Sequence, residues 1–338
     1  MSLSSGIDST LIASLTKKHF PEKKIHAVSV TFSDSYDESP LAEKTAEKLD
    51  INHNVVYVEN FLEELPQMIS IVKKPFWDLH WYHITKKAKS LSNYFISGDG
   101  GDELFGGYTF RYKKYFSIIN KNSTVNEKIK AYLSCHERDW VPDQEQIFTK
   151  KINFNWNEIH SLLFSSFDNK LSLLDQVFLA DYNGKLLYNM SPLYEKFHNH
   201  FKLFYLAPLL NPHLLKLSSQ LPEDKKYNSS TDTGKLPLLE LCEKLNIRNL
   251  ISTKKQGFSV DTKNLWKNSG KNLCDYYLSD GRTISDRWIN HDWVKKYLKK
   301  DNLDVRYVNK FLGLLAFEIW YRIFITNEMK PNEKLNFN

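Results

Sequence analysis

The sequence has few cysteines and no long apolar run, and each shortage excludes a class of protein. Its three cysteines, Cys135, Cys242 and Cys274, are widely separated and odd in number. They lack both the spacing of a metal site and the even count of a disulfide framework, which indicates a reduced, cytoplasmic protein. No apolar segment is long enough to cross a bilayer and no signal peptide precedes Ser4, so we predict no membrane partner.

A concentrated basic stripe is also missing, although the net charge is +6. The positive charge is spread over short lysine pairs, such as Lys17–Lys18 and Lys73–Lys74, with acidic residues nearby in the chain. Such a pattern is typical of a solvated surface, whereas a protein that binds nucleic acid gathers its lysines and arginines on one face. We therefore predict no nucleic-acid partner.

The chain does contain alternating strand and helix signals in its first third. Its 338 residues, 41% of them hydrophobic, are enough for one large domain or two closely packed ones. β-branched and apolar runs predict strands at 25–32, 55–58 and 93–96, and helical spacing predicts helices at 10–19, 41–49, 61–72 and 84–91. This alternation predicts an α/β fold, with a parallel sheet covered by helices on both faces.

From about Leu104 the pattern changes to long helices with no convincing strand. The clearest helices are predicted at 172–190 and 311–324, and a polar loop at 227–234. We predict an α/β core over residues 1–115 and a mostly helical region over 116–330 that packs on the same core. Only three residues precede the first glycine-containing loop, so we expect the first strand of the core to be truncated.

The first segment that carries chemistry is residues 4–10, SSGIDST, directly before a predicted helix. Backbone N–H groups at the start of a helix, together with nearby hydroxyl groups, suit a phosphate. Asp8 would repel that phosphate unless a cation bridges the two, which argues for Mg²⁺. A helix cap rich in serine and aspartate is the alternative explanation of the same residues. The segment is not the GxxxxGK[ST] loop of kinases and GTPases.

This loop resembles the SGGxDSS loop of the PP-loop ATP pyrophosphatases, with Ser5 in place of the first glycine. A second segment, SGDGGDELFGGY at residues 97–108, resembles the signature of the synthetase domain of asparagine synthetases. Its glycines permit close approach of the backbone to a ligand, and its three acidic side chains require a counter-charge. The alternating ligand pattern of a calcium loop is missing from it.

The resemblance to asparagine synthetases continues along the chain. The segments that carry it are Lys74–Pro75–Phe76 with Asp78, Pro208 to Asn211, Leu221–Pro222 with Lys225, Gly234–Lys235 to Leu239, Lys254 to Phe258 with Trp266, and 311–324 with Glu318 and Trp320. The family resemblance implies an adenine nucleotide alpha hydrolase-like (PP-loop) fold, with ATP and Mg²⁺ as the ligands.

The resemblance also implies roles for single residues. The nucleotide site would comprise Ser4, Ser5, Gly6, Asp8, Ser9, Thr10, Val30, Ser97 and Gly98, with Val30 at the adenine and the first loop at the pyrophosphate end of ATP. Mg²⁺ would bind to Asp8 and Asp102. Asp99 stands where the family often has Glu, the group that assists deprotonation of ammonia. Lys255 would offset charge that develops on the phosphates.

The acceptor side departs from the family pattern DRxSM…SLExRxPFLD. Phe204 and Leu206 stand where a Glu and an Arg are expected, and Asn211 replaces an Asp. Aspartate carries two carboxylates and an ammonium, so its site should supply paired charges. These losses favour, as an alternative, a β-lactam synthetase-like cyclase or an amidotransferase for a larger metabolite. His198 and His200 are interpreted as polar surface residues.

The sequence thus predicts a ligase that adenylates a carboxylate, by default the β-carboxylate of aspartate, and releases pyrophosphate. Aminolysis by ammonia would then give asparagine and AMP. The glutaminase domain of the family begins with a cysteine after the initiator Met, whereas this chain has Ser2. We therefore expect the glutaminase domain to be absent and ammonia to come from solution or from a separate glutaminase domain or subunit.

Two rival functions follow from the same residues. A PP-loop enzyme that modifies RNA would need the basic face that is missing. A non-catalytic nucleotide-binding subunit would not need Asp8, Asp99, Asp102 and Lys255 together. A homo-oligomer is compatible with the sequence.

Overall fold

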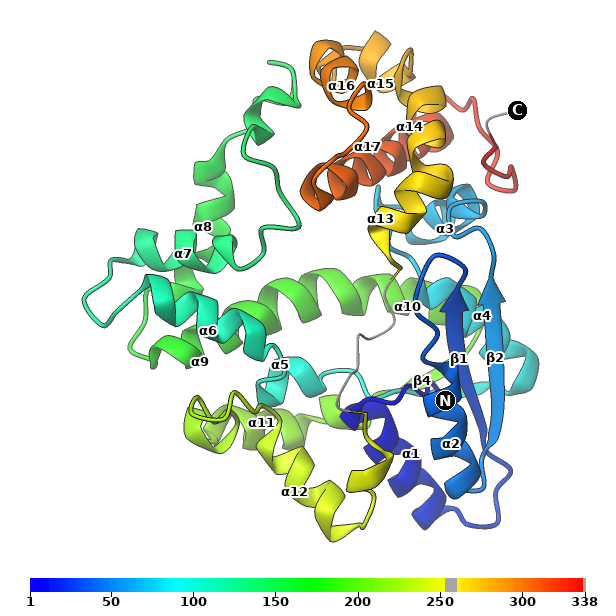
Figure 1. Ribbon diagram of the computed structural model, residues 1–338, viewed down its shortest axis with the longest axis vertical. Helices are drawn as coiled ribbons and strands as arrows, with labels where there is room; N and C mark the ends of the chain where they lie inside the picture. Colours follow the sequence, from blue (N-terminus) through cyan, green and yellow to red (C-terminus); the bar gives the residue numbers. More distant parts are fainter. Residues whose placement is uncertain (253–259, 337–338) are drawn as a thin grey trace.

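The computed structural model describes residues 1–252 and 260–336, and Figure 1 shows the arrangement of its elements. Two pairs of parallel strands form within it. β1 (His26–Phe32) pairs with β2 (Asn52–Val58), and β3 (Tyr94–Ile96) pairs with β4 (Phe204–Leu206). The three strands predicted from the sequence are therefore confirmed, with bounds that differ by up to three residues.

Residues 1–3 join the two pairs of strands. The N–H of Leu3 donates to the carbonyl of Val28 (3.0 Å), and the N–H of Val28 donates to the carbonyl of Met1 (2.8 Å). On the other side, the N–H of Ser2 donates to the carbonyl of Ile96 (3.0 Å). These three residues thus occupy the strand position between β1 and β3, and they lead directly into the loop at 4–10.

Helices surround these strands. The first third contains α1 (Ile7–His19), α2 (Ser39–Lys48), α3 (Leu65–Val72), α4 (Trp81–Leu91), α5 (Gly101–Phe105) and α6 (Thr109–Ile118). The rest contains α7 (Val125–Ser134), α8 (Trp156–Phe167), α9 (Leu173–Ala180), the π-helix η2 (Asp181–Met190), α10 (Ser191–His200), α11 (Pro212–Gln220), α12 (Leu236–Lys244), α13 (Thr262–Leu265), the π-helix η6 (Trp266–Gly270), α14 (Lys271–Leu278), α15 (Arg282–Ser285), α16 (His291–Leu298) and α17 (Val305–Phe324). Short 3₁₀ turns are η1 (Gln144–Gln146), η3 (Pro208–Leu210), η4 (Glu223–Lys225) and η5 (Arg248–Leu250).

Both faces of the strands are covered, as the sequence predicts. Successive side chains of a strand point to opposite faces. In β1, Val28 and Val30 belong to the apolar cluster built on α3 and α4, whereas Ala27 belongs to the cluster built on α1 and α2. The prediction of an α/β structure is therefore confirmed, with two small parallel sheets in place of one continuous sheet.

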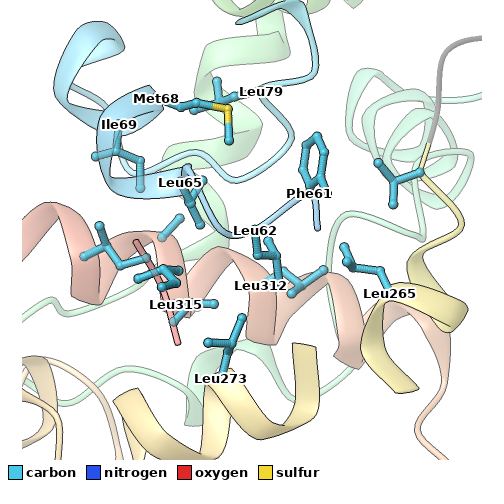
Figure 2. Close-up of a cluster of buried hydrophobic side chains, with 14 of the residues drawn as sticks. Phe61, Leu62, Leu65, Met68, Ile69, Leu79, Leu265, Leu273, Leu312 and Leu315 are labelled. Carbon is cyan, nitrogen blue, oxygen red and sulfur yellow. The ribbon is translucent and has the colours of Figure 1, made fainter. Parts of the chain in front are cut away.

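The largest apolar cluster extends from the strands into the C-terminal helices. Figure 2 shows α17 packed against α3 and the segment before it, with Leu312 and Leu315 facing Leu62 and Leu65. Leu273 of α14 closes the other side of α17. The C-terminal helices thus fold onto the core of the first third of the chain.

Two predictions about the later part of the chain need correction. The expectation of no strand after Leu104 is wrong, because Phe204–Leu206 pairs with β3. Three residues give too short a run for periodicity to show. The helix predicted over 172–190 continues into α10, and its second half, Asp181–Met190, is a π-helix.

No helix among the described residues combines the length and the apolar character that a membrane crossing requires.

Candidate functional site

The loop at residues 4–10 is folded around its own serines. Ser9 Oγ accepts from the N–H of Ser4 (3.1 Å) and lies 2.9 Å from Ser4 Oγ, which in turn accepts from the N–H of Gly6 (3.2 Å). Thr10 Oγ1 reaches the carbonyl of Ser4 (3.5 Å). Among the described residues, no side chain caps the start of α1. The first N–H groups of this helix are therefore available to bind an anion.

The second loop, at residues 97–108, packs directly on the first. A Cβ added to Gly98 would lie 2.8 Å from the carbonyl carbon of Asp8 and 2.9 Å from the nitrogen of Ser9. A Cβ on Gly101 would lie 2.1 Å from Asp8 Oδ1. Both positions therefore need glycine because Asp8 occupies the space beside them. The two motifs predicted from the sequence therefore lie against each other.

Lys235 connects the acidic residues of the two loops. Its Nζ lies 2.6 Å from Asp8 Oδ2 and 2.7 Å from Asp102 Oδ1, and its side chain is buried. Burial alone would lower the pKa of Lys235, but the charges of Asp8 and Asp102 outweigh it and raise that pKa. Lys235 is therefore a permanent cation between two carboxylates.

The fold brings Lys235 to this place through close backbone packing. The N–H of Lys235 donates to the carbonyl of Phe105 (2.8 Å), and a Cβ on Gly234 would lie 1.9 Å from the carbonyl oxygen of Gly106. The family pattern includes Gly234–Lys235, but sequence reasoning assigned Lys235 no role. A glycine directly before this lysine, in a chain with two glycine-rich loops, is the feature of the sequence that could have identified Lys235 as a site residue.

Asp8 and Asp102 fit the residues expected around Mg²⁺. Asp8 Oδ1 is buried and has no hydrogen-bond partner among the described residues. Mg²⁺ commonly uses one or two carboxylates and takes its other ligands from water and substrate phosphates. The described part of the chain holds no group of three or more His, Cys, Asp or Glu suited to a metal, so an all-protein cage is not built there.

Asp99 lies at the end of β3 and is held through one oxygen. Ser97 Oγ donates to Asp99 Oδ2 (2.8 Å), and the hydroxyl of Tyr205 donates to the same oxygen. Burial raises the pKa of Asp99, and the hydrogen bonds from Tyr205 and Ser97 only partly offset the rise. A carboxylate with a raised pKa is better suited to accept a proton near neutral pH.

An aromatic cluster from three elements supports Tyr205. Its ring stacks on that of His198 with centroids 3.9 Å apart, and His198 Nε2 accepts from Trp81 Nε1 (2.9 Å). Trp81 in turn stacks on Tyr194, with centroids 4.4 Å apart. The interpretation of His198 as a surface residue is wrong, since it is 3% exposed and packed inside this cluster. His200 is exposed, as expected.

Phe204 and Leu206 lie on the other side of β4 from Tyr205. They are 66% and 55% exposed, and alternation along a strand places them away from Asp99. Their replacement of the Glu and Arg of the family pattern therefore removes no charge from the surroundings of Asp99. Sequence reasoning pointed to these two positions and missed Tyr205 between them.

A second charged cluster surrounds Tyr108, at the end of the second loop. The hydroxyl of Tyr108 donates to buried Glu103, and the cations of Lys185 and Arg111 lie 3.6 and 4.5 Å from the centre of its ring. Burial lowers the pKa of Lys185, and repulsion from Arg111 adds to this effect. The π-helix η2 carries Lys185 and the buried Asp181, which lies 3.5 Å from Arg111.

The remaining predicted residues fall into three groups. Ser5 and Ser97 are fully buried, and Ser5 Oγ has no hydrogen-bond partner among the described residues. Val30 is buried within β1, two residues before the strand ends. Lys255 lies outside the described residues, so its role stays a prediction.

A cavity of about 740 Å³ lies beside α2 and not at the two loops. Its described lining includes Tyr36, Leu41, Thr45 and Ser252, and none of the predicted nucleotide-binding residues. Ser252 links it to the first loop, because the N–H of Ser252 donates to the carbonyl of Ser5 (2.9 Å). The chemistry-bearing residues converge elsewhere, so we place the candidate site at the loops.

Comparison with known proteins places the chain in a family. A family model described as asparagine synthase matches residues 1–322. The chain is 24% identical to asparagine synthetase (glutamine-hydrolyzing) 1 of Bacillus subtilis in a match that covers 98% of this chain and 57% of that protein. It is 22% identical to a putative asparagine synthetase (glutamine-hydrolyzing) of Mycobacterium tuberculosis, covering 97% of this chain and 55% of that protein.

A shorter match has higher identity. A putative asparagine synthetase (glutamine-hydrolyzing) 2 of Methanocaldococcus jannaschii is 33% identical over 111 residues, or 31% of this chain and 22% of that protein. The chain spans little more than half the length of the relatives that match it along nearly its whole length.

Proposed function

Because the chain belongs to the asparagine synthase family, we propose that it forms an amide from a carboxylic acid and ammonia, driven by cleavage of ATP to AMP and pyrophosphate. The observation that carries this proposal is the convergence of the two loops on Asp8, Lys235 and Asp102. Phosphates bind to cations and N–H donors. The two loops bring together the cation of Lys235 and the N–H groups at the start of α1. The strands and the loop at 4–10 support a PP-loop type of nucleotide site.

ATP binds with its phosphates at the start of α1. Ser4, Ser5, Gly6, Ser9 and Thr10 line the turn, and the free N–H groups of the helix face the pyrophosphate end. Val30, Ser97 and Gly98 lie on the neighbouring strand ends, on the adenine and α-phosphate side. Asp8 and Asp102 hold Mg²⁺, which supplies charge neutralisation of the phosphates when bound.

The first chemical step joins the acid to the nucleotide. A carboxylate oxygen of the acid attacks the α-phosphorus, the bond from that phosphorus to the α–β bridging oxygen breaks, and pyrophosphate leaves. Lys235 supplies a positive charge beside the loop, because Asp8 and Asp102 raise its pKa. Lys255 is the second cation that we assign to the developing phosphate charge.

The second step forms the amide. The nitrogen of ammonia attacks the acyl carbon of the adenylate, the acyl–oxygen bond breaks, and AMP leaves. The attacking nitrogen gives up a proton to Asp99, whose raised pKa suits this role. With aspartate as the acid, the β-carboxylate reacts and asparagine is the product.

The names and lengths of the relatives bear on the source of ammonia. Those proteins are named as glutamine-hydrolysing, and this chain spans 57% of the Bacillus subtilis protein. We propose that ammonia comes from a glutaminase domain or subunit apart from the described residues, or from solution.

The proposal is tested by release of pyrophosphate from ATP with a panel of carboxylic acids and ammonia. We expect aspartate to support release, and a different acid from the panel would instead favour the cyclase or amidotransferase alternative. In Asp8→Asn the rate should fall on the order of 10²–10³-fold, as for the loss of one preorganised electrostatic group.

Asp50→Asn is the matched control, because Asp50 is an exposed partner of Lys17 far from the loops in sequence and contacts none of their described residues. It should keep the full rate. Release with no acid of the panel, in protein that binds ATP, would mean that the chain is a nucleotide-binding subunit and not a ligase.

A further inference from the structure

Among the described residues, the side chains that hold Asp99 donate hydrogen bonds to one of its two carboxylate oxygens. Two side chains, Ser97 through Oγ and Tyr205 through its hydroxyl, donate to Oδ2, and their oxygens are 2.8 Å apart. Oδ1 has no hydrogen bond to any described residue. One oxygen of the carboxylate is therefore fixed in place, and the other is the atom that can meet a nucleophile.

Tyr205 comes to Asp99 only because β4 joins the strands. Its backbone pairs with Phe95 in the register of β3 and β4, and the following residue, Leu206, accepts from the N–H of Ser97 (3.0 Å). A residue 106 positions away in the chain is thereby set beside the carboxylate. The side-chain alternation described above sends Tyr205 inward and its two neighbours outward.

The ring of Tyr205 packs against other aromatic rings. It stacks on His198 at an angle of 22° between ring planes, and its other aromatic neighbour is Phe95, with centroids 6.3 Å apart. His198 is kept in the tautomer with a bare Nε2, because that nitrogen accepts from Trp81 Nε1. Moving the phenol oxygen of Tyr205 away from Asp99 would require the whole ring to move and would break this stack. The cluster therefore fixes the position of the oxygen that meets Asp99.

We propose that Tyr205, supported by His198 and Trp81, is a positioning residue that holds Asp99 through Oδ2 and presents Oδ1 to the attacking amine. This inference rests on the proposed function, since it needs Asp99 as the proton acceptor of the second step. Aspartate is one methylene shorter than the glutamate common in the family, so its carboxylate has less reach and its direction matters more. Tyr205 itself makes no contact with substrate.

The test removes only the hydroxyl. In Tyr205→Phe we measure two rates, carboxylate-dependent exchange of pyrophosphate into ATP and amide formation from ammonia, with aspartate or with the acid that the panel identifies. We expect exchange and the KM for ATP to stay within about twofold. The kcat for amide formation should fall about 10- to 100-fold, part of the roughly 10²–10⁴-fold that a positioned general base supplies.

Tyr94→Phe is the matched control. Tyr94 is a tyrosine of β3 that is 65% exposed and stacks on Phe204 on the outer side, so both rates should be unchanged. A melting temperature of Tyr205→Phe within about 2 °C of the wild type would show that packing is intact.

A double-mutant cycle separates positioning from a general structural role. If Tyr205 acts through Asp99, adding Tyr205→Phe to Asp99→Asn should change amide formation by less than about twofold, because coupled residues are not additive. Full additivity, or an equal fall of exchange and amide formation in Tyr205→Phe, would overturn the inference. No exchange in the wild-type protein with any acid would instead overturn the proposed function, and the inference with it.

Discussion

The absence of a side chain at Gly101 leaves the space that the carboxylate of Asp8 occupies. A Cβ on Gly101 would lie 2.1 Å from Asp8 Oδ1 and 2.5 Å from Asp8 Cγ. Asp8 belongs to the first turn of α1, so its backbone is fixed and only its side chain could move. Glycine at position 101 therefore allows Asp8 to face Lys235 and Asp102.

Gly101→Ala should inactivate the site while leaving the fold intact. The added methyl group would turn Asp8 away, and misplacement of a reacting group by about 1 Å can cost on the order of 10²-fold in rate. The measurement is carboxylate-dependent pyrophosphate exchange. Gly313→Ala is the control, because nothing lies within 4 Å of its added Cβ in the middle of α17. It should keep full exchange and gain up to about 1 kcal/mol in stability.

Lys235→Met should destabilise the fold because it leaves two carboxylates facing each other without their cation. Removal of one partner of a buried ion pair costs about 3–5 kcal/mol, and we expect this loss in urea unfolding. Mg²⁺ should restore more stability to this variant than to the wild type, which tests the metal assignment without an activity assay.

The control for this change is Lys244→Met, which breaks an exposed pair with Glu240 one helical turn away. Its effect should stay below about 0.5 kcal/mol. A Lys235→Met protein as stable as the wild type, and indifferent to Mg²⁺, would argue against a charged bridge at this place.

At the scale of elements, α17 connects the C-terminal helices to the strand-bearing part of the chain. Its apolar face packs on α3 and α14, and Leu312 is fully buried between them (Figure 2). A buried carboxylate, Glu318, ties the same helix to α15 by accepting from the N–H groups of Arg282 (2.7 Å) and Thr283 (2.8 Å). The far end of the chain is therefore part of the same packed unit.

Leu312→Ala should destabilise the whole protein and not α17 alone. Truncation of a buried leucine typically costs about 2–5 kcal/mol, through lost transfer free energy and the cavity left behind. Leu162→Ala in α8 is the control, since Leu162 is 77% exposed and should change stability by less than about 0.5 kcal/mol. Unfolding in urea, followed by circular dichroism, measures both, and a single transition with a lowered midpoint is the expected result.

For the whole molecule, buried histidines set the response to acid. Burial lowers the pKa of His83 and His198 to about 4 and that of His136 to about 3, with repulsion from Arg111 adding to the effect at His136. A histidine with a depressed pKa in the folded state is neutral there but takes up a proton when unfolded. Its contribution to stability is therefore complete above about pH 6.5 and is lost as the pH falls toward 4.

His83→Gln should accordingly reduce the acid sensitivity of the protein. Because burial lowers the pKa of His83 to about 4, the variant should lose up to about 3 kcal/mol less stability than the wild type between pH 7 and pH 4. His213→Gln, at an exposed position, serves as the control. Parallel curves of unfolding free energy against pH for His83→Gln and the wild type would contradict the prediction.

Local patterns in the sequence were sufficient for the strands β1 to β3 and the helices α1 to α4, whereas α5 and α6 were not predicted. Runs of apolar and β-branched residues predicted β1 and β2. Glycines next to acidic residues indicated that residues 97–108 form a loop that binds a ligand. β4 was not predicted because a strand of three residues is too short to show a periodic pattern. The inward direction of Tyr205, which lies between two exposed neighbours, depends on the register with β3 and so could not be inferred either.

The amino-acid sequence by itself determined the family of this protein, its alternating α/β order and the residue types at the candidate nucleotide site. Those properties depend on motifs and on spacings of a few residues. Only the tertiary structure decided that Lys235 bridges Asp8 and Asp102, and that Tyr205 holds Asp99. These contacts join residues as far as 227 positions apart, and such pairs meet only when strand pairing and close glycine packing bring their backbones together.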